Sequence, residues 1–295
     1  MSSCPLCSHD QHNNFPISYT FHEKKFSARK CRHCSFIFLD PRPTTDDLKL
    51  LYSDEYFLFD GADCGAHSSS DYETAARNGS MKFPEILGWI RKYKPSGDFF
   101  EIGCGMGYFL DYVRDAGYTV SGIEYAMLGT TICRKNFQLD VAQTSFEEYP
   151  IQEQRFDVVF MGDVLEHFID PLPMAKKAYL LLRPGGILAA EVPSMFNTLV
   201  GRLAAAGLRL LGRTKQMPMP PYHVNEFTPR TLKEMVQRAG FRNVEIIQRI
   251  KSPVSITLRG NIVEKAIKLL LQYPNYLITK TLKRFGDRLL VIGMK

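Results

Sequence analysis

The stretch FFEIGCGMGYFL, residues 99–110, decides the fold of this chain because it joins a short apolar run to three closely spaced glycines and a helix-like segment. A strand, a glycine-rich turn and a helix N-terminus together form a site for a nucleoside-bearing cofactor. Gly103, Gly105 and Gly107 let the backbone approach such a ligand without a Cβ in the way. Tyr108 stands where the dinucleotide fingerprint G-x-G-x-x-G has its last glycine. This departure favours S-adenosylmethionine over NAD.

Length and composition predict a globular chain with one main domain and room for an accessory module. The sequence has 295 residues, and 45% of them are hydrophobic, which is enough to bury a full α/β core. The net charge of +6 permits an anionic substrate or surface without requiring one. No apolar run reaches the roughly 18 residues of a membrane helix, and the start MSSCPLC does not resemble a signal peptide. We therefore expect a cytoplasmic protein.

Four of the seven cysteines form two C-x-x-C pairs near the N-terminus. Cys4 and Cys7 are separated by 23 residues from Cys31 and Cys34, a gap similar to that between the two knuckles of a zinc ribbon. An odd number of cysteines in paired motifs favours metal binding in a reducing compartment over a disulfide framework. Four thiolates complete a tetrahedral Zn²⁺ shell, so we expect structural zinc in a ribbon-like module over residues 1–40. The alternative is a pair of reduced turns without metal.

A helical connector is predicted over residues 41–94, followed by a cofactor domain over residues 95–295. From residue 98 onward, short apolar runs alternate with amphipathic segments, the pattern of a mainly parallel, doubly wound sheet. Glu124 stands at the end of the second expected strand, about 20 residues past the glycine turn. A carboxylate at that place can accept both ribose hydroxyls of an adenosine, although an ordinary surface glutamate is the alternative.

Four motifs of the chain occur in the order and spacing of a known family. They are EIGCGMG at 101–107, GIE at 122–124, FDVVFMGDVLEH at 156–167 and LRPGGIL at 182–188. Together they resemble the class I S-adenosylmethionine-dependent methyltransferases over residues 95–250. The resemblance implies an enzyme with an α/β, doubly wound, Rossmann-like sheet of seven strands. A zinc ribbon ahead of such a domain is similar to the architecture of deoxysugar C-methyltransferases, which implies a saccharide acceptor.

The resemblance also implies roles for single residues of the cofactor site. Glu101 and the glycine turn would face the methionine part of the cofactor, and the carboxylate after the second strand would bind the ribose. Phe146 would approach the adenine through its backbone N–H and ring, beside Ser145, where many relatives have Asp. Asp163 would border the sulfonium. The implied cofactor set is Glu101, Gly103, Cys104, Gly105, Gly107, Glu124, Ser145, Phe146 and Asp163.

The acceptor side is predicted from the segment PPYHVNEFTPR, residues 220–230. Open α/β sheets bind ligands beyond the carboxyl ends of their strands, and this segment should return across that edge. Similar segments contribute a histidine to the acceptor side in relatives, so His223 is the first candidate for a base or for orienting the substrate. Tyr222 and Asn225 stand beside it. His167 is a further candidate, and for each histidine the alternative is a purely structural hydrogen bond.

Two basic, apolar insertions interrupt the cofactor domain, near residues 195–219 and 255–284. In the first, arginines and a lysine are interspersed with leucine and alanine, and no acidic residue occurs. Helices of this kind lie on anionic membranes, close over a cleft or pack on an ordinary core. Peripheral contact with the inner membrane surface and a lipid-linked acceptor therefore stand beside simple packing as alternatives.

Three functions are compatible with these patterns. The first is an S-adenosylmethionine-dependent methyltransferase for a small molecule, with a nucleotide-linked or lipid-linked sugar as candidate acceptor. The second is a zinc-containing protein that modifies or binds RNA, but residues 13–39 lack a dense stripe of lysine and arginine, so no nucleic-acid partner is expected. The third is an NAD-linked oxidoreductase, which Tyr108 and the later motifs oppose.

Overall fold

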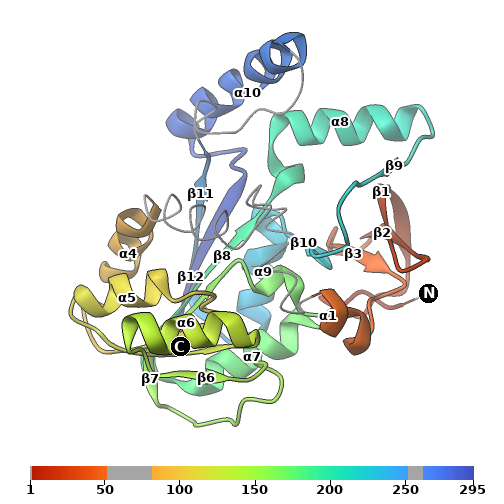
Figure 1. The fold of residues 1–295 in the computed structure, drawn as a ribbon. Coiled ribbons are helices and arrows are strands. Elements are labelled where there is room, and N and C mark those ends of the chain that lie inside the picture. Colours follow the sequence, from red (N-terminus) through yellow and green to blue (C-terminus); the bar gives the residue numbers. More distant parts are fainter. Residues whose placement is uncertain (1, 52–81, 252–261) are drawn as a thin grey trace.

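The computed structural model describes residues 2–51, 82–251 and 262–295, which fold around two β-sheets (Figure 1). The larger sheet belongs to the predicted cofactor domain and has seven strands. In the order in which they lie side by side, they are β11 (Arg242–Arg249), β12 (Arg288–Met294), β8 (Leu182–Pro193), β7 (Phe156–Gly162), β4 (Asp98–Ile102), β5 (Thr119–Glu124) and β6 (Val141–Gln143). The strands from β8 to β6 are parallel, and β12 runs antiparallel to both of its neighbours. The prediction of a mainly parallel, doubly wound sheet is confirmed.

Helices cover both faces of this sheet, as an alternation of strands and helices requires. The side chains of Phe99 and Phe100 in β4 point to opposite faces and enter two different core clusters. On the Phe99 face pack α4 (Phe83–Arg91), α5 (Tyr108–Asp115) and α6 (Met127–Phe137). On the Phe100 face pack α7 (Pro171–Leu181) and α9 (Pro229–Arg238). The glycine turn leads from β4, an interior strand of this sheet, into α5.

The smaller sheet is built on the N-terminal module but also contains strands from the main domain. Its central strands are β1 (His12–Phe21), β2 (Lys24–Cys31) and β3 (Ile37–Asp40), and α1 (Thr45–Leu51) follows them. At one edge β9 (Lys215–Gln216) pairs with β1, and at the other β10 (Asn225–Glu226) pairs with β3. The domain division at residue 40 stays a prediction, because the chain supplies this sheet from both sides of that boundary.

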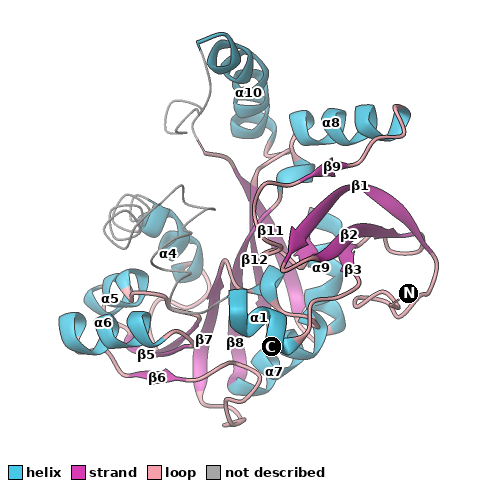
Figure 2. Ribbon diagram, turned by 45° about the vertical axis from the view of Figure 1, so that its right-hand side comes forward, coloured by secondary structure: helices cyan, strands magenta, loops and turns pink. Residues whose placement is uncertain are grey.

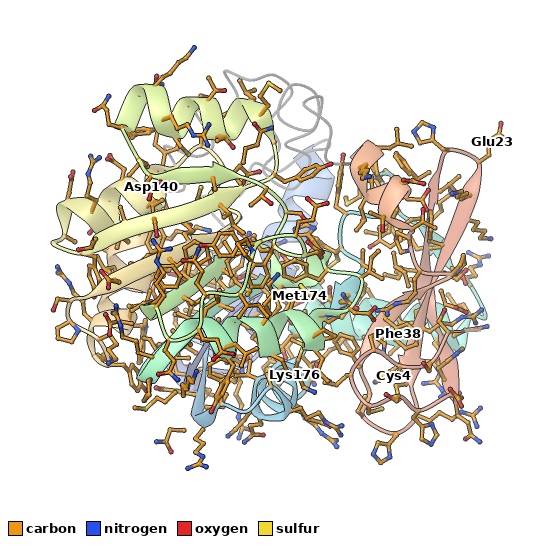
Figure 3. The ribbon with its side chains drawn as sticks, turned by 90° about the horizontal axis from the view of Figure 1, so that it is seen from below. Cys4, Glu23, Phe38, Asp140, Met174 and Lys176 are labelled. Atoms are coloured by element: carbon orange, nitrogen blue, oxygen red, sulfur yellow. The ribbon has the colours of Figure 1, made fainter. Side chains whose placement is uncertain are left out.

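The hydrophobic core crosses from the N-terminal module into the main domain. Cys4, Leu6 and Phe38 belong to the same buried cluster as Phe100 of the large sheet and Phe227 after β10. Seen from below, Cys4 and Phe38 lie in the module next to α7, which carries Met174 and Lys176 (Figure 3). Because the two parts share buried side chains, the module is fixed beside the sheet rather than tethered to it.

The two predicted insertions extend from the same end of the molecule (Figures 1 and 2). The first forms the short helix η4 (Met195–Asn197) and then α8 (Leu199–Leu210), and the second forms α10 (Ile262–Leu282). The backbone N–H of Leu199 donates to Oδ1 of Asn275 in α10 at 2.8 Å, so the two helices are joined. Within the described part of the chain, no helix has both the length and the apolar character needed to cross a membrane. Residues 52–81 of the predicted connector and the first part of the second insertion lie outside the described residues.

Candidate functional site

The glycine turn opens onto a cavity of about 840 Å³ at the carboxyl ends of the parallel strands. Gly103 and Gly105 line this cavity, and both have positive φ, +68° and +55°. A Cβ on Gly103 would lie 2.6 Å from Cγ2 of Val164, so only glycine fits there. The N–H groups of Gly103 and Cys104 donate to the carbonyl oxygen of Ile123 at 2.9 and 3.1 Å, which fixes the turn against β5.

Glu124 ends β5 and holds the other side of the turn. Its Oε2 accepts the N–H of Gly105 at 2.8 Å, and its Oε1 accepts the N–H of Ala126 at 2.9 Å. Burial raises the pKa of Glu124, and the N–H groups of Ala126 and Gly105 act in the opposite direction. Each carboxylate oxygen has the capacity for a second hydrogen bond, so the group can hold the turn and still face a ligand in the cavity.

Ser145 and Phe146 follow β6 and line the same cavity. The hydroxyl of Ser145 accepts the N–H of Glu148 at 3.2 Å, which closes the loop locally. The carbonyl of Phe146 accepts a hydrogen bond from Nζ of Lys177 at 2.7 Å. The N–H of Thr144 donates to the carbonyl oxygen of Glu124 at 3.1 Å, so the loop lies beside Glu124 on the cavity wall.

Three members of the predicted cofactor set lie beneath the turn and not on the cavity wall. Glu101 is 4% exposed, and burial raises its pKa well above the usual range. Cys104 is buried, with its Sγ 3.9 Å from Sγ of Cys133. Gly107 begins α5 with φ +84°. In the described structure, Glu101, Cys104 and Gly107 support the turn from below, while Gly103 and Gly105 form the wall.

Asp163 follows β7, and its half-buried carboxylate belongs to a group of charges around the fully buried Glu191. Its carboxylate pairs with the guanidinium of Arg288 and lies 3.5 Å from Nζ of Lys82. Lys82 also contacts Glu191 at 3.0 Å, and Arg249 pairs with the other oxygen of Glu191. Although burial raises the pKa of Asp163, Arg288 and Lys82 outweigh it and hold this pKa well below the usual range. Asp163 is therefore an anion on the cavity wall at neutral pH.

The far end of the cavity carries Glu166, His167 and His223. Glu166 and His167 belong to the short helix η3 (Leu165–His167), one turn past Asp163, and His223 comes from the loop before β10. Nε2 of His167 lies 3.7 Å from Oε1 of Glu166, and Nε2 of His223 lies 3.9 Å from the same oxygen. Burial, followed by the negative charge of Asp163, raises the pKa of Glu166 to about 8. The two predicted histidines are thus brought together, around a carboxylate that the sequence reasoning missed.

Tyr222 and Asn225, the other predicted acceptor residues, position the loop and do not line the cavity within the described structure. The carbonyl of Tyr222 accepts a hydrogen bond from Nδ1 of His167 at 2.8 Å. Nδ2 of Asn225 donates to the carbonyl oxygen of Phe168 at 2.7 Å. The N–H of Val224 donates to the main-chain oxygen of Glu166 at 3.1 Å. The loop is therefore bound to η3 and to Phe168 by backbone and side-chain hydrogen bonds, which hold His223 at the cavity.

The four N-terminal cysteines also come together. Sγ of Cys4 lies 3.6 Å from that of Cys34, and Sγ of Cys7 lies 3.6 Å from that of Cys31. All four sulfurs lie within 4.8 Å of one another. Zn–S bonds of about 2.3 Å in a tetrahedral site place the sulfurs about 3.8 Å apart. The thiols therefore have the arrangement of a closed four-sulfur metal site.

A parallel-sheet α/β fold with a glycine turn, an acidic residue after the second strand and a cavity at the strand ends defines a protein that binds a nucleoside-bearing cofactor. Residues 82–246 match the model of a family described as the methyltransferase domain. Since the match covers more than half of the chain, the protein belongs to this family.

Two known methyltransferases are similar in sequence to about half of this chain. An S-adenosylmethionine-dependent methyltransferase of Mycolicibacterium smegmatis is 28% identical over 145 residues, 49% of this chain and 51% of the relative. A ubiquinone biosynthesis O-methyltransferase of Actinobacillus pleuropneumoniae is 30% identical over 169 residues, 51% of this chain and 69% of the relative. The chain therefore spans about half the length of the first relative and about two thirds of the second.

Two solved structures share the fold. A methyltransferase dependent on the same cofactor from Thermotoga maritima superimposes with a TM-score of 0.53, 20% identity, and coverage of 77% of this chain and 95% of that chain. Another from Archaeoglobus fulgidus has a TM-score of 0.52, 19% identity, and coverage of 73% and 94%. These likenesses confirm the Rossmann-like methyltransferase fold that the sequence predicts.

Proposed function

We propose that this protein transfers a methyl group from S-adenosylmethionine to a small-molecule acceptor. The main support for the proposal is that one cavity of about 840 Å³ contains both halves of the site. The glycine turn and Glu124 line one part of it, and Glu166, His167 and His223 line another. Bound S-adenosylmethionine supplies an electrophilic methyl group on a sulfonium. Such a transfer depends mainly on alignment and on exclusion of water, and a cavity with two functionally distinct ends provides both.

The cofactor end of the cavity has the donors and acceptors that a nucleoside requires. The backbone of Gly103 and Gly105 can approach the ligand closely, and Glu124 would accept from the ribose hydroxyls with the lone pairs that its backbone partners leave. Ser145 and Phe146 would flank the adenine. Asp163 also lines the cavity and is negatively charged. Its negative charge would attract the positively charged sulfonium of the cofactor.

At the acceptor end, His223 and His167 would orient the acceptor or take its proton. Both imidazoles line the cavity, and both have Nε2 directed at the Glu166 carboxylate. A base is needed only when the acceptor atom carries a proton, and an imidazole titrates in the appropriate range. Tyr222 and Asn225 would serve the same end indirectly, by holding the loop that carries His223.

A second cavity supports an acceptor with a polar head and an apolar portion. It measures about 410 Å³ and shares Pro193, Met195 and Arg288 with the first cavity. Its further lining is mainly apolar and comes from α8, η4 and the edge of the small sheet, including Ile17, Phe196, Val200, Ala204, Leu208 and Met217. We therefore propose a lipid-linked acceptor, such as a lipid-linked saccharide, whose tail would lie against α8 while its head reaches His223.

The outer surface of the α8 region fits the same proposal. Leu203 and Leu210 are 71% and 88% exposed, and Arg209 and Arg213 lie near them. Exposed leucines beside basic residues favour the surface of an anionic membrane. The protein would thus collect its acceptor from the membrane face and present the head group to the cavity.

Zinc in the N-terminal module would be structural. Four thiols at tetrahedral spacing fill the coordination shell, so the metal would stabilise the small sheet without taking part in methyl transfer. Elemental analysis of the purified protein should find one zinc per chain that is lost when Cys31 is replaced by Ser.

Titration calorimetry and an acceptor screen test the proposed function. We expect S-adenosylmethionine and S-adenosylhomocysteine to bind and NAD not to bind. A cofactor-dependent methylation screen over lipid-linked saccharides, nucleotide sugars, quinone precursors and RNA should find its best substrate among the lipid-linked compounds. Binding of NAD without binding of the sulfonium cofactor would refute the proposal, and RNA affinity with a steep salt dependence would favour an RNA-directed role instead.

A further inference from the structure

Glu166 is a buried carboxylate whose two oxygens lack a hydrogen-bond partner within the described structure. The residue is 1% exposed and lines the cavity at its acceptor end. Leaving a buried carboxyl group without such partners is costly, because the group loses its hydration and gains no hydrogen bond in exchange. A group of this kind in a cavity indicates a ligand that interacts with the carboxylate.

The two imidazoles beside Glu166 offer ring nitrogens to the same ligand. Nδ1 of His167 lies 2.8 Å from the carbonyl oxygen of Tyr222, and because a carbonyl only accepts, Nδ1 carries the proton. The other ring nitrogen, Nε2, is the His167 atom that faces Glu166, at 3.7 Å from its Oε1. Histidines that bind metals commonly donate their other ring N–H to a backbone carbonyl in this way.

The distances favour a shared cation over direct hydrogen bonds. Nε2 of His167 and Nε2 of His223 lie 3.7 and 3.9 Å from Oε1 of Glu166, beyond the range of an N–H···O bond. Donor atoms that are each about 2.0–2.2 Å from one cation lie about 3 to 4 Å apart. One ligand atom from each of Glu166, His167 and His223 lies within 4.8 Å of the others.

We propose that Glu166, His167 and His223 bind one divalent cation at the acceptor end of the cavity. Two imidazoles and one carboxylate suit a cation of the Mn²⁺, Fe²⁺, Co²⁺ and Zn²⁺ group, whereas Mg²⁺ and Ca²⁺ prefer oxygen ligands alone. Three protein ligands leave coordination positions open toward the cavity. This site is separate from the four cysteines, which have the softer ligand set.

A cation here would give the acceptor end a specific chemistry, and this consequence rests on the proposed methyltransferase function. The open positions would bind oxygens of the acceptor, such as a hydroxyl and a neighbouring oxygen. Metal coordination lowers the pKa of a bound hydroxyl, so the hydroxyl would release its proton to solvent water. The resulting oxyanion would form a bond to the methyl carbon as the bond from that carbon to the sulfonium sulfur breaks, and S-adenosylhomocysteine would leave. The histidines would then orient the acceptor as ligands of the cation, and a free imidazole base would not be required.

Mn²⁺ titration followed by electron paramagnetic resonance tests the site in the full-length protein. Mn²⁺ prefers nitrogen and oxygen ligands, so zinc-loaded cysteines should not compete for it. We expect one bound Mn²⁺ per chain. Glu166→Gln and His223→Gln should each weaken Mn²⁺ binding at least tenfold. Glu166→Asp keeps the carboxylate, so its affinity for Mn²⁺ should lie between that of these two variants and that of the unchanged protein. His33→Gln, at an exposed histidine of the N-terminal module, is the matched control and should bind Mn²⁺ normally.

Calorimetry with S-adenosylhomocysteine on the same variants shows whether they are folded, since the glycine turn lies at the other end of the cavity. Absence of Mn²⁺ binding to the unchanged protein, or undiminished binding to folded Glu166→Gln and His223→Gln, would overturn the metal site. Because Mn²⁺ binding is measured without a methyl donor, its failure leaves the proposed function standing. Conversely, a protein that binds Mn²⁺ and does not bind the methyl donor refutes only the function.

Discussion

At the scale of single residues, Glu124 fixes the glycine turn and also lines the cavity. Its two oxygens accept N–H groups from Gly105 and Ala126, so the carboxylate joins the glycine turn to the start of α6. It is also part of the cavity wall. A side chain in this position holds the turn, and the proposed function gives it the further task of accepting hydrogen bonds from the cofactor.

Replacing Glu124 should therefore weaken cofactor binding strongly. We expect Glu124→Ala to lower the affinity for S-adenosylhomocysteine by about 1 to 3 kcal/mol, because hydrogen bonds to a charged acceptor are lost. Glu124→Gln should lose less binding free energy than Glu124→Ala, since the amide keeps one oxygen acceptor. Titration calorimetry measures both, with Glu153→Gln at an exposed loop residue as the control. If Glu124→Ala bound the ligand as tightly as the control does, Glu124 would not belong to the site.

Glu226 in β10 should make the stability of the protein depend on pH. Burial raises its pKa from 4.5 to about 7, against the N–H of Phe196 and the charge of His223, which lower it. The folded protein thus binds the proton more tightly than the unfolded chain. The stabilisation is complete below about pH 4.5 and is lost as the pH rises through about 7.

The variant Glu226→Gln removes this dependence, because its amide stays neutral while Oε1 can still accept the Phe196 N–H. We compare the free energy of unfolding of this variant with that of the unchanged protein. The difference, variant minus unchanged, should increase by about 1 to 3 kcal/mol from pH 5 to pH 8. Melting temperatures of both proteins at the two pH values measure the effect. An equal difference at both pH values would mean that Glu226 does not titrate in this range.

At the scale of elements, α8 shows how a helix can be amphipathic without entering the core. None of its residues is fully buried, yet one side lines the second cavity with Val200, Ala204 and Leu208. The opposite side exposes Leu203 and Leu210 to solvent. The helix is held by Thr198, whose side chain caps it, and by Asn275 of α10.

Exchanging the exposed leucines tests membrane contact. The double variant Leu203→Ser, Leu210→Ser should bind vesicles that contain phosphatidylglycerol at least tenfold more weakly, since a buried leucine contributes about 1.5 to 3 kcal/mol. Its melting temperature should not change, because both side chains are solvent-exposed. Leu50→Ser in α1, 56% exposed, is the control. The membrane proposal fails if the unchanged protein does not sediment with the vesicles.

The cofactor half of the site could be predicted from sequence because its determinants are local. A strand, a glycine turn and Glu124 follow each other within about one βαβ unit, where spacing reports position. The acceptor half depends on long-range pairing that leaves little trace. The two-residue strands β9 and β10 have no periodicity to detect, and only the sheet brings Asn225 opposite Phe38. Glu166 was visible in the motif DVLEH, but its burial between two histidines was not.

The whole molecule is held together by buried charges as well as by its apolar core. Arg288 of β12 pairs with Asp163 after β7, and Lys82 before α4 contacts Asp163 and Glu191. Arg249 of β11 extends the group to Glu191. These contacts join the ends of β7, β8, β11 and β12 beside the cavity, so the loss of one cation removes part of the positive charge that balances Asp163 and the buried Glu191.

Arg288→Leu should destabilise the fold far more than the loss of an exposed pair. We expect a loss of about 3 to 5 kcal/mol in the free energy of unfolding, because Arg288 is mostly buried, pairs with Asp163 and also helps to balance the charge of the fully buried Glu191. Arg183→Leu is the matched control, since Arg183 is 40% exposed and pairs with Asp98 and Asp157 at the surface. That control should lose less than about 1 kcal/mol. Urea unfolding of the unchanged protein and the two variants measures these losses. Equal losses of unfolding free energy in both variants would show that burial does not make the Arg288 pair more important for stability than the exposed Arg183 pairs.

The edges of the small sheet have a consequence for engineering chimeras. Residues 215–216 and 225–226 complete that sheet on either side, so its amino-terminal strands and the segment carrying His223 form one structural unit. A graft that exchanged residues 1–40 alone would leave both short strands facing an unfamiliar partner. Transplanting residues 1–40 together with 215–227 would keep the pairing of β9 with β1 and of β10 with β3. The pieces that must be exchanged jointly are therefore nearly two hundred positions apart in the chain.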